Sequence, residues 1–526
     1  MGNAVLFLLP LVSALILSAA YPPFDLGVMA WIGLSPFLYA LRRASPARAA
    51  GMGLFFGLLF VTGVFCWARS VSEISLLSFI LWLIPFSLYF LLFGFFYRLM
   101  SKNIGIWILI GAPVLWVLLE YVRSNLFFLA WPWNLLGHSQ YRCLTIIQVS
   151  DITGVYGISF LIVLVNQFLS QVPELVKIRD KKYGKLTSKK NHLITISLAV
   201  TLILASVFSY GLYHLGDSPA EKQFRVALVQ TNRIVEDNMA VSDQVKHLNV
   251  YDTLSKRASK ENPDLIVWPA ASLPAALSSS RLVRNTVTQL ARETKTSLVA
   301  GGAGVEKMKP KKSGYKSYSN SEFLIDSSGQ LKGQYNKMKL VPFNEYLPLQ
   351  GMINWPEWIT TLKESFTPGN RFLLFDINGV KFGTPICWEN MFPDLFRQFV
   401  KDGANFMIMA TNEAFLGRTA GPYQTLAVAV FRAVENRVAI ARSAPTGVSA
   451  FINPDGEIIE RITDINGDDL FVKGFIVRDI PLSDKKTFYT LYGDIFAYCC
   501  IGLAIVFIMF PLMIKINRPT LKEKLI

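Results

Sequence analysis

Long apolar segments limit the fold of this 526-residue chain more than any other feature of its sequence. A helix that crosses a bilayer needs about 20 mostly apolar residues. Eight segments approach this length, at about 4–20, 26–41, 51–68, 75–97, 104–122, 153–171, 193–213 and 491–514. Because all eight lie outside the stretch 217–490, the pattern favours a polytopic α-helical membrane domain with eight transmembrane helices over the buried core helices of a soluble protein.

The stretch 217–490 has a different pattern. Short β-like runs, such as Arg225–Gln230 and Asp264–Trp268, alternate with polar-faced helical stretches at 239–260 and 281–295. This alternation predicts an extramembrane α/β domain. The expected domains are a membrane domain with seven transmembrane helices at 1–216, the α/β domain at 217–490, and the eighth helix with a basic tail at 491–526.

The distribution of positive charge predicts how the chain crosses the membrane. The formal net charge is +15. Sixteen basic residues fall in four segments expected on the cytoplasmic side, at 42–50, 98–103, 172–192 and 515–526, whereas the outside segments before residue 217 hold three. Loops rich in Lys and Arg stay in the cytoplasm, so 217–490 is expected on the far side. That stretch holds 33 basic and 29 acidic residues, which argues against a nucleic-acid partner.

One cysteine stands apart from the others. Four of the five, Cys66, Cys143, Cys499 and Cys500, lie in or beside apolar segments, and Cys387 alone lies in 217–490. No disulfide is therefore expected within that domain. The four His show no metal-ligand spacing, so no metal site is expected. A lone thiol in such a domain is a candidate for chemistry.

A Cys, a Lys and a Glu in this domain are residue types that nucleophilic catalysis can use. Cys387 follows an apolar run in Lys381–Asn390 and precedes a turn or helix start, an arrangement that can expose and activate a thiol. A buried structural cysteine is the alternative at this point. Lys337 can hold an oxyanion, and Glu345 can orient that lysine or act as a base. Each of the two charged residues alone is better explained as part of a surface ion pair, and only together with Cys387 do they suggest a catalytic site.

Several short motifs together resemble the apolipoprotein N-acyltransferases, a membrane-embedded family of the nitrilase superfamily. The matching stretches are Asp264–Pro269, Tyr335–Lys337, Leu340–Phe343, Glu345–Tyr346, Ile386–Glu389, Thr411–Asn412, Gly421–Gln424, Arg432–Asn436 and Thr446–Gly447. Gly154–Gly157 and the eight apolar segments fit the membrane part. The resemblance extends over essentially the whole chain.

The resemblance implies a fold, a reaction and a location. The α/β domain would be a nitrilase-like αββα sandwich on the periplasmic side of a bacterial inner membrane. The family transfers an acyl chain from a phospholipid to the α-amino group of a diacylglyceryl-cysteine at the N-terminus of an apolipoprotein, through a thioester. By position, Cys387 would be the nucleophile, Lys337 the oxyanion stabiliser and Glu345 the acid that supports Lys337. No cofactor is implied, and a monomer is expected.

The chain departs from the family's pattern at one catalytic position. The family carries a general-base Glu directly after Trp-Pro, and here Ala270 follows Trp268-Pro269. A positioned general base is worth about 10²–10⁴-fold in rate. Ala270 is consistent either with a substitution in a working enzyme or with a paralogue that only binds lipids or lipoproteins. Glu389 is close in sequence to Cys387, but sequence alone gives no geometry that would make it the replacement base.

The substrate-binding residues are expected near these motifs. The candidates are Trp268, Tyr346, Trp388, Glu389 and Phe415. The stretch 343–368 is rich in apolar and aromatic residues, including Trp355 and Trp358. It can form either a small satellite core or a mobile arm that enters the outer leaflet, because Trp and Tyr favour that level.

One further loop and two other functions complete the expectations. Trp131 and Trp133 can form an aromatic belt or part of an acyl groove. The expected partners are a phospholipid acyl donor, a diacylated apolipoprotein acceptor and the membrane, with no nucleic acid. The alternatives are a catalytically silent lipoprotein- or phospholipid-binding protein, which Ala270 favours, and a membrane-anchored amidase.

Overall fold

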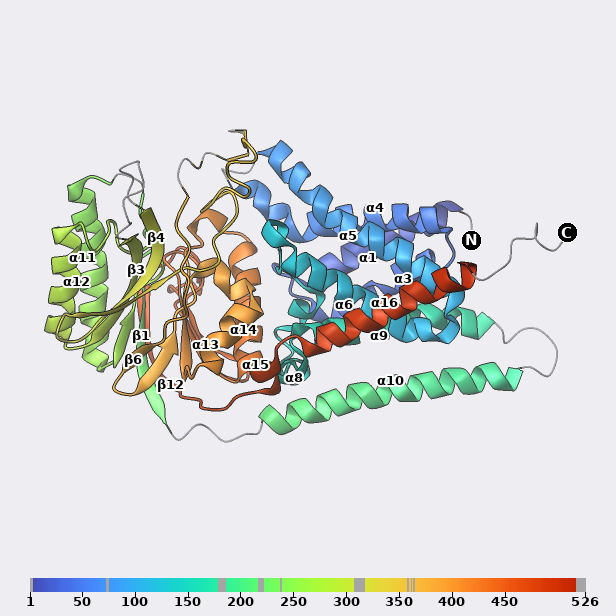
Figure 1. Cartoon of the computed structure of the whole chain (residues 1–526). Coiled ribbons are helices and arrows are strands. Elements are labelled where there is room, and N and C mark those ends of the chain that lie inside the picture. The colour runs from blue at the N-terminus through green and yellow to red at the C-terminus, as the bar shows by residue number, and fades with distance from the viewer. Residues whose placement is uncertain are drawn as a thin grey trace. The chain divides into compact units, whose positions relative to one another are not determined.

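The computed structural model describes residues 3–71, 75–177, 186–215, 222–236, 239–306, 317–356, 359–360, 362 and 365–516. The chain forms two compact units (Figure 1). One unit comprises Met1–Arg69, Glu73–Gly216 and Asp494–Ile526, and the other comprises Ser70–Ser72 and Asp217–Gly493.

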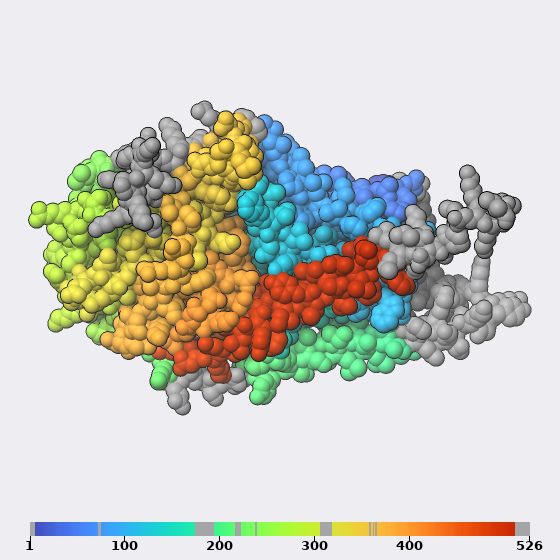
Figure 2. All heavy atoms as spheres, in the orientation of Figure 1, coloured from blue at the N-terminus to red at the C-terminus, as the bar shows by residue number. Residues whose placement is uncertain are grey.

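The first unit is helical. Its longer helices are α1 (Asn3–Ser18), α4 (Pro46–Phe65), α5 (Leu76–Asn103), α6 (Ile108–Asn125), α9 (Val155–Lys177), α10 (Leu186–Leu215) and α16 (Ile495–Ile516). Among the described residues, five helical segments are long and apolar enough to cross a membrane, namely Pro46–Ser70, Leu76–Asn103, Gly105–Asn125, Val155–Pro173 and Ile194–Leu215. Only 11% of the apolar window in Ile194–Leu215 is buried, and Figure 2 shows the green surface of α10 open along much of its length. A transmembrane protein is therefore confirmed, with α10 suited to contact lipid.

The other three predicted spans form shorter apolar helices. These are Leu6–Ser18, Gly27–Leu41 and Ile495–Phe510 within the described side chains. Gly27–Leu41 is divided among η1 (Gly27–Met29), α2 (Ala30–Gly33) and α3 (Ser35–Leu41). Pro36 lies in the first turn of α3, where proline is tolerated. The predicted count of eight transmembrane helices thus stays a prediction.

Glycines bring α4 and α5 together. A Cβ on Gly53 would lie 2.9 Å from the carbonyl carbon of Phe90, and one on Gly94 would lie 2.9 Å from the carbonyl carbon of Ala49. Real Cβ atoms essentially never come so close to backbone atoms. Small residues at such crossings allow the close backbone approach that stabilises helix pairs in lipid.

Trp131 and Trp133 lie inside the helical unit. Their rings stack at 5.5 Å between centroids and an interplanar angle of 22°. Both rings also pack on Phe65, and Trp131 packs on Trp82. Trp133 is buried. This pair is therefore an interior cluster and not an outward-facing aromatic belt.

The second unit contains two six-stranded sheets. Their strand orders are β12-β1-β2-β3-β4-β5 and β11-β10-β9-β8-β7-β6. The first sheet consists of β1 (Gln223–Gln230), β2 (Leu265–Val267), β3 (Ser297–Glu306), β4 (Ser317–Ile325), β5 (Leu331–Asn336) and β12 (Gly474–Pro481). The second sheet consists of β6 (Phe375–Ile377), β7 (Val380–Gly383), β8 (Phe406–Ala410), β9 (Ala439–Ser443), β10 (Ala450–Ile452) and β11 (Ile458–Arg461).

Helices cover the outer face of each sheet. Helices α11 (Val241–Ala258) and α12 (Arg281–Thr294) share a hydrophobic core with the first sheet. Helices α13 (Pro393–Lys401) and α14 (Gly421–Asn436) pack on the second sheet, and β1 packs on β9 between the layers. Figure 1 shows the strands between these two pairs of helices. The predicted nitrilase-like αββα sandwich is confirmed.

The ends of parallel strands position the candidate residues. Strands β1, β2 and β3 pair in parallel, as do β7, β8 and β9. Residues that follow such strands gather at one edge of a sheet, where ligands bind in α/β proteins. Ala270 comes three residues after β2, and Cys387 comes four residues after β7.

Candidate active site

Cys387 lies at a sharp turn of the backbone. It begins the short helix η8 (Cys387–Met391), and its φ is 50°, in the left-handed region. Non-glycine residues rarely adopt this conformation, and those that do cluster at functional sites. Its Sγ lies 3.8 Å from the backbone oxygen of Asn412, and the side chain is half-buried. The turn thus holds the thiol partly accessible at a defined position.

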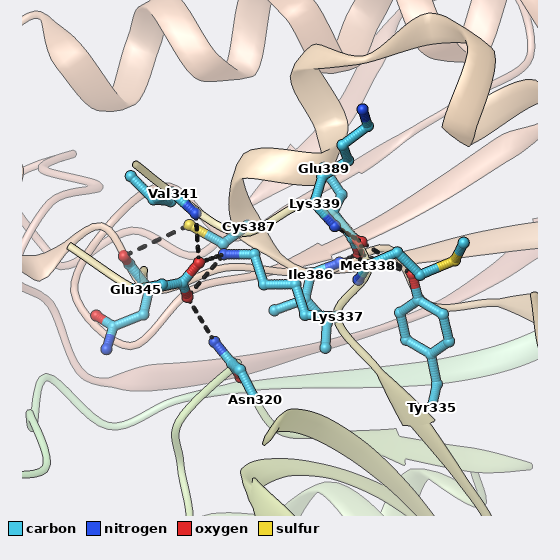
Figure 3. Close-up of polar contacts among 11 residues, drawn as sticks. Asn320, Tyr335, Lys337, Met338, Lys339, Val341, Glu345, Ile386, Cys387 and Glu389 are labelled. Atoms are coloured by element: carbon cyan, nitrogen blue, oxygen red, sulfur yellow. Dashed lines mark hydrogen bonds and ion pairs between the residues drawn. The ribbon is translucent and has the colours of Figure 1, made fainter. Parts of the chain in front are cut away.

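Lys337 brings a buried positive charge to this thiol. It follows β5, and its backbone N–H donates to the oxygen of Asn320 at 2.8 Å. The ammonium group is 1% exposed and donates to both carboxylate oxygens of Glu345, at 2.8 and 2.7 Å. Burial alone lowers the pKa of Lys337, but the charges of Glu345 and Cys387 outweigh burial, so its pKa is raised. The lysine therefore stays charged beside Cys387 (Figure 3).

Glu345 has no oxygen left for a substrate. Besides the two bonds from Lys337, it accepts a bond from the Asn320 amide at 3.1 Å and one from the Val341 N–H at 2.7 Å. Four hydrogen bonds from three donor groups reach one carboxylate and hold it in place. This geometry suits a residue that orients Lys337, as the resemblance implies.

Glu389 joins the segments that carry Cys387 and Lys337. One of its oxygens accepts from the N–H groups of Met338 at 2.6 Å and Lys339 at 3.0 Å. The other accepts from the Ile386 N–H at 2.8 Å. The Tyr335 hydroxyl donates to the same carboxylate at 2.9 Å, as Figure 3 shows. Since β5 and β7 belong to different sheets, this fully buried carboxylate clamps the two sides of the site.

Replacing Glu389 with Gln is expected to loosen the site. An amide NH₂ must then face at least one of the N–H donors that the carboxylate now accepts. We expect a loss of about 1–3 kcal/mol in the free energy of unfolding and a slower reaction of Cys387. Thermal unfolding of Glu389→Gln in detergent measures the first effect, and Glu293→Gln, at an exposed position of α12, is the control. Unchanged stability would show that the clamp is dispensable.

The other predicted binding residues are placed differently. Trp268 is fully buried between β2 and α11, where its indole N–H donates to Ser255 at 2.9 Å and its ring packs on Tyr251. This burial leaves no surface for a substrate, and the same holds for Glu389. Trp388 is buried with its ring against Phe392. Phe415 is 52% exposed, so it is open to contact.

The aromatic stretch 343–368 has an inner and an outer part. The rings of Phe343 and Trp355 pack edge to face at 4.9 Å, and the Trp355 indole N–H donates to the oxygen of Pro348 at 2.7 Å. Met352 is 83% exposed, and Tyr346 is half-buried. Trp358 lies outside the described residues. The packed base fits the satellite core. The exposed Met352 is compatible with an arm that enters the outer leaflet, which stays a prediction.

A further acidic residue, Glu322, was not singled out from the sequence. It lies in β4 and is 0% exposed, and neither carboxylate oxygen has a hydrogen-bond partner among the described residues. Burial raises its pKa well above the ordinary value. Glu is depleted in strands, so an acid inside a strand-like run, between Ser321 and Phe323, is the sequence feature that could have identified Glu322. In the described part of the chain, no group of three His, Cys, Asp or Glu residues is placed to hold a metal ion.

Two family models match separate parts of this chain. The family model of the apolipoprotein N-acyltransferase N-terminal domain matches residues 13–168, and the carbon-nitrogen hydrolase model matches residues 225–484. Among solved structures, Nit3 of Saccharomyces cerevisiae is 22% identical, with a TM-score of 0.38 over 50% of this chain and 92% of that chain. A mutant of the Nesterenkonia AN1 amidase is 19% identical, with a TM-score of 0.37 over 51% of this chain and 94% of that chain.

Curated relatives match along nearly the whole chain. Apolipoprotein N-acyltransferase 1 of Treponema denticola is 29% identical and covers 93% of this chain and 92% of its own length. The apolipoprotein N-acyltransferase of Geobacter metallireducens is 32% identical and covers 95% of this chain and 94% of its own length. With this identity over both the membrane and the α/β parts, the chain belongs to the apolipoprotein N-acyltransferase family.

Proposed function

We propose that this chain transfers an acyl chain from a phospholipid to the α-amino group of the N-terminal diacylglyceryl-cysteine of apolipoproteins, through a thioester on Cys387. The observation that carries the proposal is the pairing of a strained, half-buried thiol with the buried ammonium of Lys337. A thiolate is the reacting form of cysteine, and a neighbouring cation favours it.

The reaction would run in two steps. In the first, the Cys387 sulfur attacks the ester carbonyl of the phospholipid, the ester C–O bond breaks, and a lysophospholipid leaves with the thiol's proton. In the second, the acceptor amine attacks the thioester, the C–S bond breaks, and the thiol regains a proton from the amine. In both steps Lys337 would stabilise the negative oxygen of the tetrahedral intermediate, while Glu345 holds Lys337 in place.

Ala270 favours a second candidate, a silent protein that binds phospholipid or lipoprotein without reaction. A transfer assay separates the two. The purified chain is mixed with phospholipid and a labelled diacylated lipopeptide, and the peptide's mass is followed. The proposal predicts a gain of one acyl chain at the N-terminal amine. Binding of the lipopeptide with no mass gain would support the silent protein. Ammonia release from a small amide, with no acyl transfer, would instead support a membrane-anchored amidase.

We also propose eight transmembrane helices with the α/β domain on the periplasmic side of a bacterial inner membrane. Its support is the excess of Lys and Arg in the loops assigned to the cytoplasm. Cysteines placed at exposed positions test this arrangement in a chain whose five native cysteines are Ala. In spheroplasts, a membrane-impermeant maleimide should label Asn466→Cys and spare Arg43→Cys until the cells are lysed. Labelling of Arg43→Cys in intact spheroplasts would show that the orientation is opposite to the one proposed.

A further inference from the structure

We infer that Glu322 is the general base of this site and takes the place of the acid that is missing at position 270. The inference rests on the acyl transfer proposed above and assigns a catalytic residue to it. Three independent observations support it: the position of the carboxylate, the face of the sheet on which it lies, and its surroundings.

The carboxylate of Glu322 lies beside the backbone of Ala270. Gly301 of β3 is the cross-strand partner of Glu322 in β4. A Cβ on Gly301 would lie 2.5 Å from Oε1 of Glu322, 2.6 Å from the Cα of Ala270 and 2.8 Å from the N of Ala271. These atoms therefore surround one point, and Gly301 leaves it free because it has no side chain. The carboxylate of Glu322, which comes from β4, therefore lies next to the backbone of residue 270.

The alternation of β4 puts Glu322 on the face that carries the other candidate residues. Phe323 and Ile325 belong to the core under α11 and α12. Successive residues of a strand point to opposite faces, so Asn320 and Glu322 face away from those helices. The Asn320 amide donates to Glu345. Tyr335, the cross-strand partner of Glu322 in β5, donates a hydrogen bond from its hydroxyl to Glu389. Glu322 thus lies on the same face as the network that holds Lys337.

Its surroundings leave Glu322 able to take a proton. Buried polar groups are nearly always hydrogen-bonded, yet neither oxygen of Glu322 has a partner among the described residues. Among the other acids near Cys387, Glu345 and Glu389 accept bonds at both oxygens. Glu413 keeps one oxygen without a partner among the described residues, but its other oxygen forms an ion pair with Arg442 at 2.5 Å. Glu322 has neither a hydrogen bond nor a counter-charge there. A buried carboxyl with a raised pKa is the form in which enzymes use Glu near neutral pH.

The proton path follows from this assignment. Glu322 takes the proton of the Cys387 thiol as sulfur bonds to the ester carbonyl carbon, and the protonated Glu322 then gives it to the oxygen of the leaving lysophospholipid. In the second step Glu322 takes a proton from the attacking amine and returns it to the Cys387 sulfur as the C–S bond breaks. The carboxylate is regenerated after each step, so no further reactant is needed.

The test compares Glu322→Gln with the unchanged protein. Gln keeps the size of the side chain and removes the proton acceptor. We expect formation of the Cys387 thioester from phospholipid, followed by intact mass, to fall about 10²–10⁴-fold. Alkylation of Cys387 by iodoacetamide near neutral pH should slow as well. The thermal unfolding midpoint should stay equal or rise, because the change removes a buried carboxylate that lacks a partner. Glu293→Gln, at an exposed position of α12, should change none of these rates.

A relocated acid gives the second arm of the test. Glu322→Ala should lose the same activity as Glu322→Gln. Combining Glu322→Ala with Ala270→Glu should raise the rate at least tenfold above that of Glu322→Ala, since the acid then reaches the same point from the turn after β2. An unchanged thioester rate and alkylation rate in Glu322→Gln would overturn the inference while the acyl transfer stands. Absence of acyl transfer by the unchanged protein would overturn the proposed function itself, and the inference with it.

Discussion

Replacing Cys387 with Ala is expected to abolish both thioester formation and acyl transfer. The thiol is the group that we propose to carry the acyl chain between the two steps, so its loss should lower the transfer rate by at least about 10³-fold. The rate is measured with a labelled diacylated lipopeptide in phospholipid and detergent. The fold should persist, because Cys387 is half-buried and Ala fits the space that the thiol leaves.

The matched control for Cys387→Ala is Cys143→Ala, which removes an exposed thiol of the helical unit. This variant should keep the rate of the unchanged protein. Transfer by Cys387→Ala within tenfold of the unchanged protein would show that the acyl chain does not pass through this sulfur.

Replacing Lys337 with Met is expected to lower both activity and stability. Loss of one oxyanion donor costs about 10²–10³-fold in rate. The change also leaves the buried carboxylate of Glu345 without its counter-charge, which costs about 3–5 kcal/mol when a buried ion pair loses one partner. The first effect is measured as the rate of thioester formation, and the second as the midpoint of thermal unfolding.

Two further variants separate these effects of Lys337. Lys337→Met combined with Glu345→Gln removes the unpaired charge, so stability should recover while the rate stays low. Lys332→Met, at an exposed position of β5, the strand that Lys337 follows, should alter neither quantity. A full recovery of the rate in the double variant would mean that Lys337 serves only to neutralise Glu345.

The fold of the α/β unit could be predicted because its elements carry local signals. The apolar runs at Arg225–Gln230 and Asp264–Trp268 became β1 and β2, and the stretches 239–260 and 281–295 became α11 and α12. The helical unit was harder to count. Segment 26–41 is apolar along its length, yet the chain turns within it, and hydropathy does not register such breaks.

The candidate site could be predicted only in part. Motifs identified Cys387, Lys337 and Glu345, and the structure brings Lys337 to both of the others. Trp268 and Glu389 adjoin the same motifs in sequence, but their side chains serve the core and the clamp. Glu322 is 52 residues from Ala270 in sequence, and only the pairing of β3 with β4 brings its carboxylate to that position.

The most direct measurement is the intact mass of the protein during one reaction cycle. The unchanged chain, incubated with phospholipid of a single acyl composition, should gain the mass of one acyl chain on the peptide that contains Cys387. Neutral hydroxylamine should remove this mass, as expected for a thioester, and a diacylated lipopeptide should remove it while gaining the same acyl chain. A protein that acylates the lipopeptide without ever carrying the acyl mass, or that never acquires it from phospholipid, would contradict the thioester mechanism at Cys387.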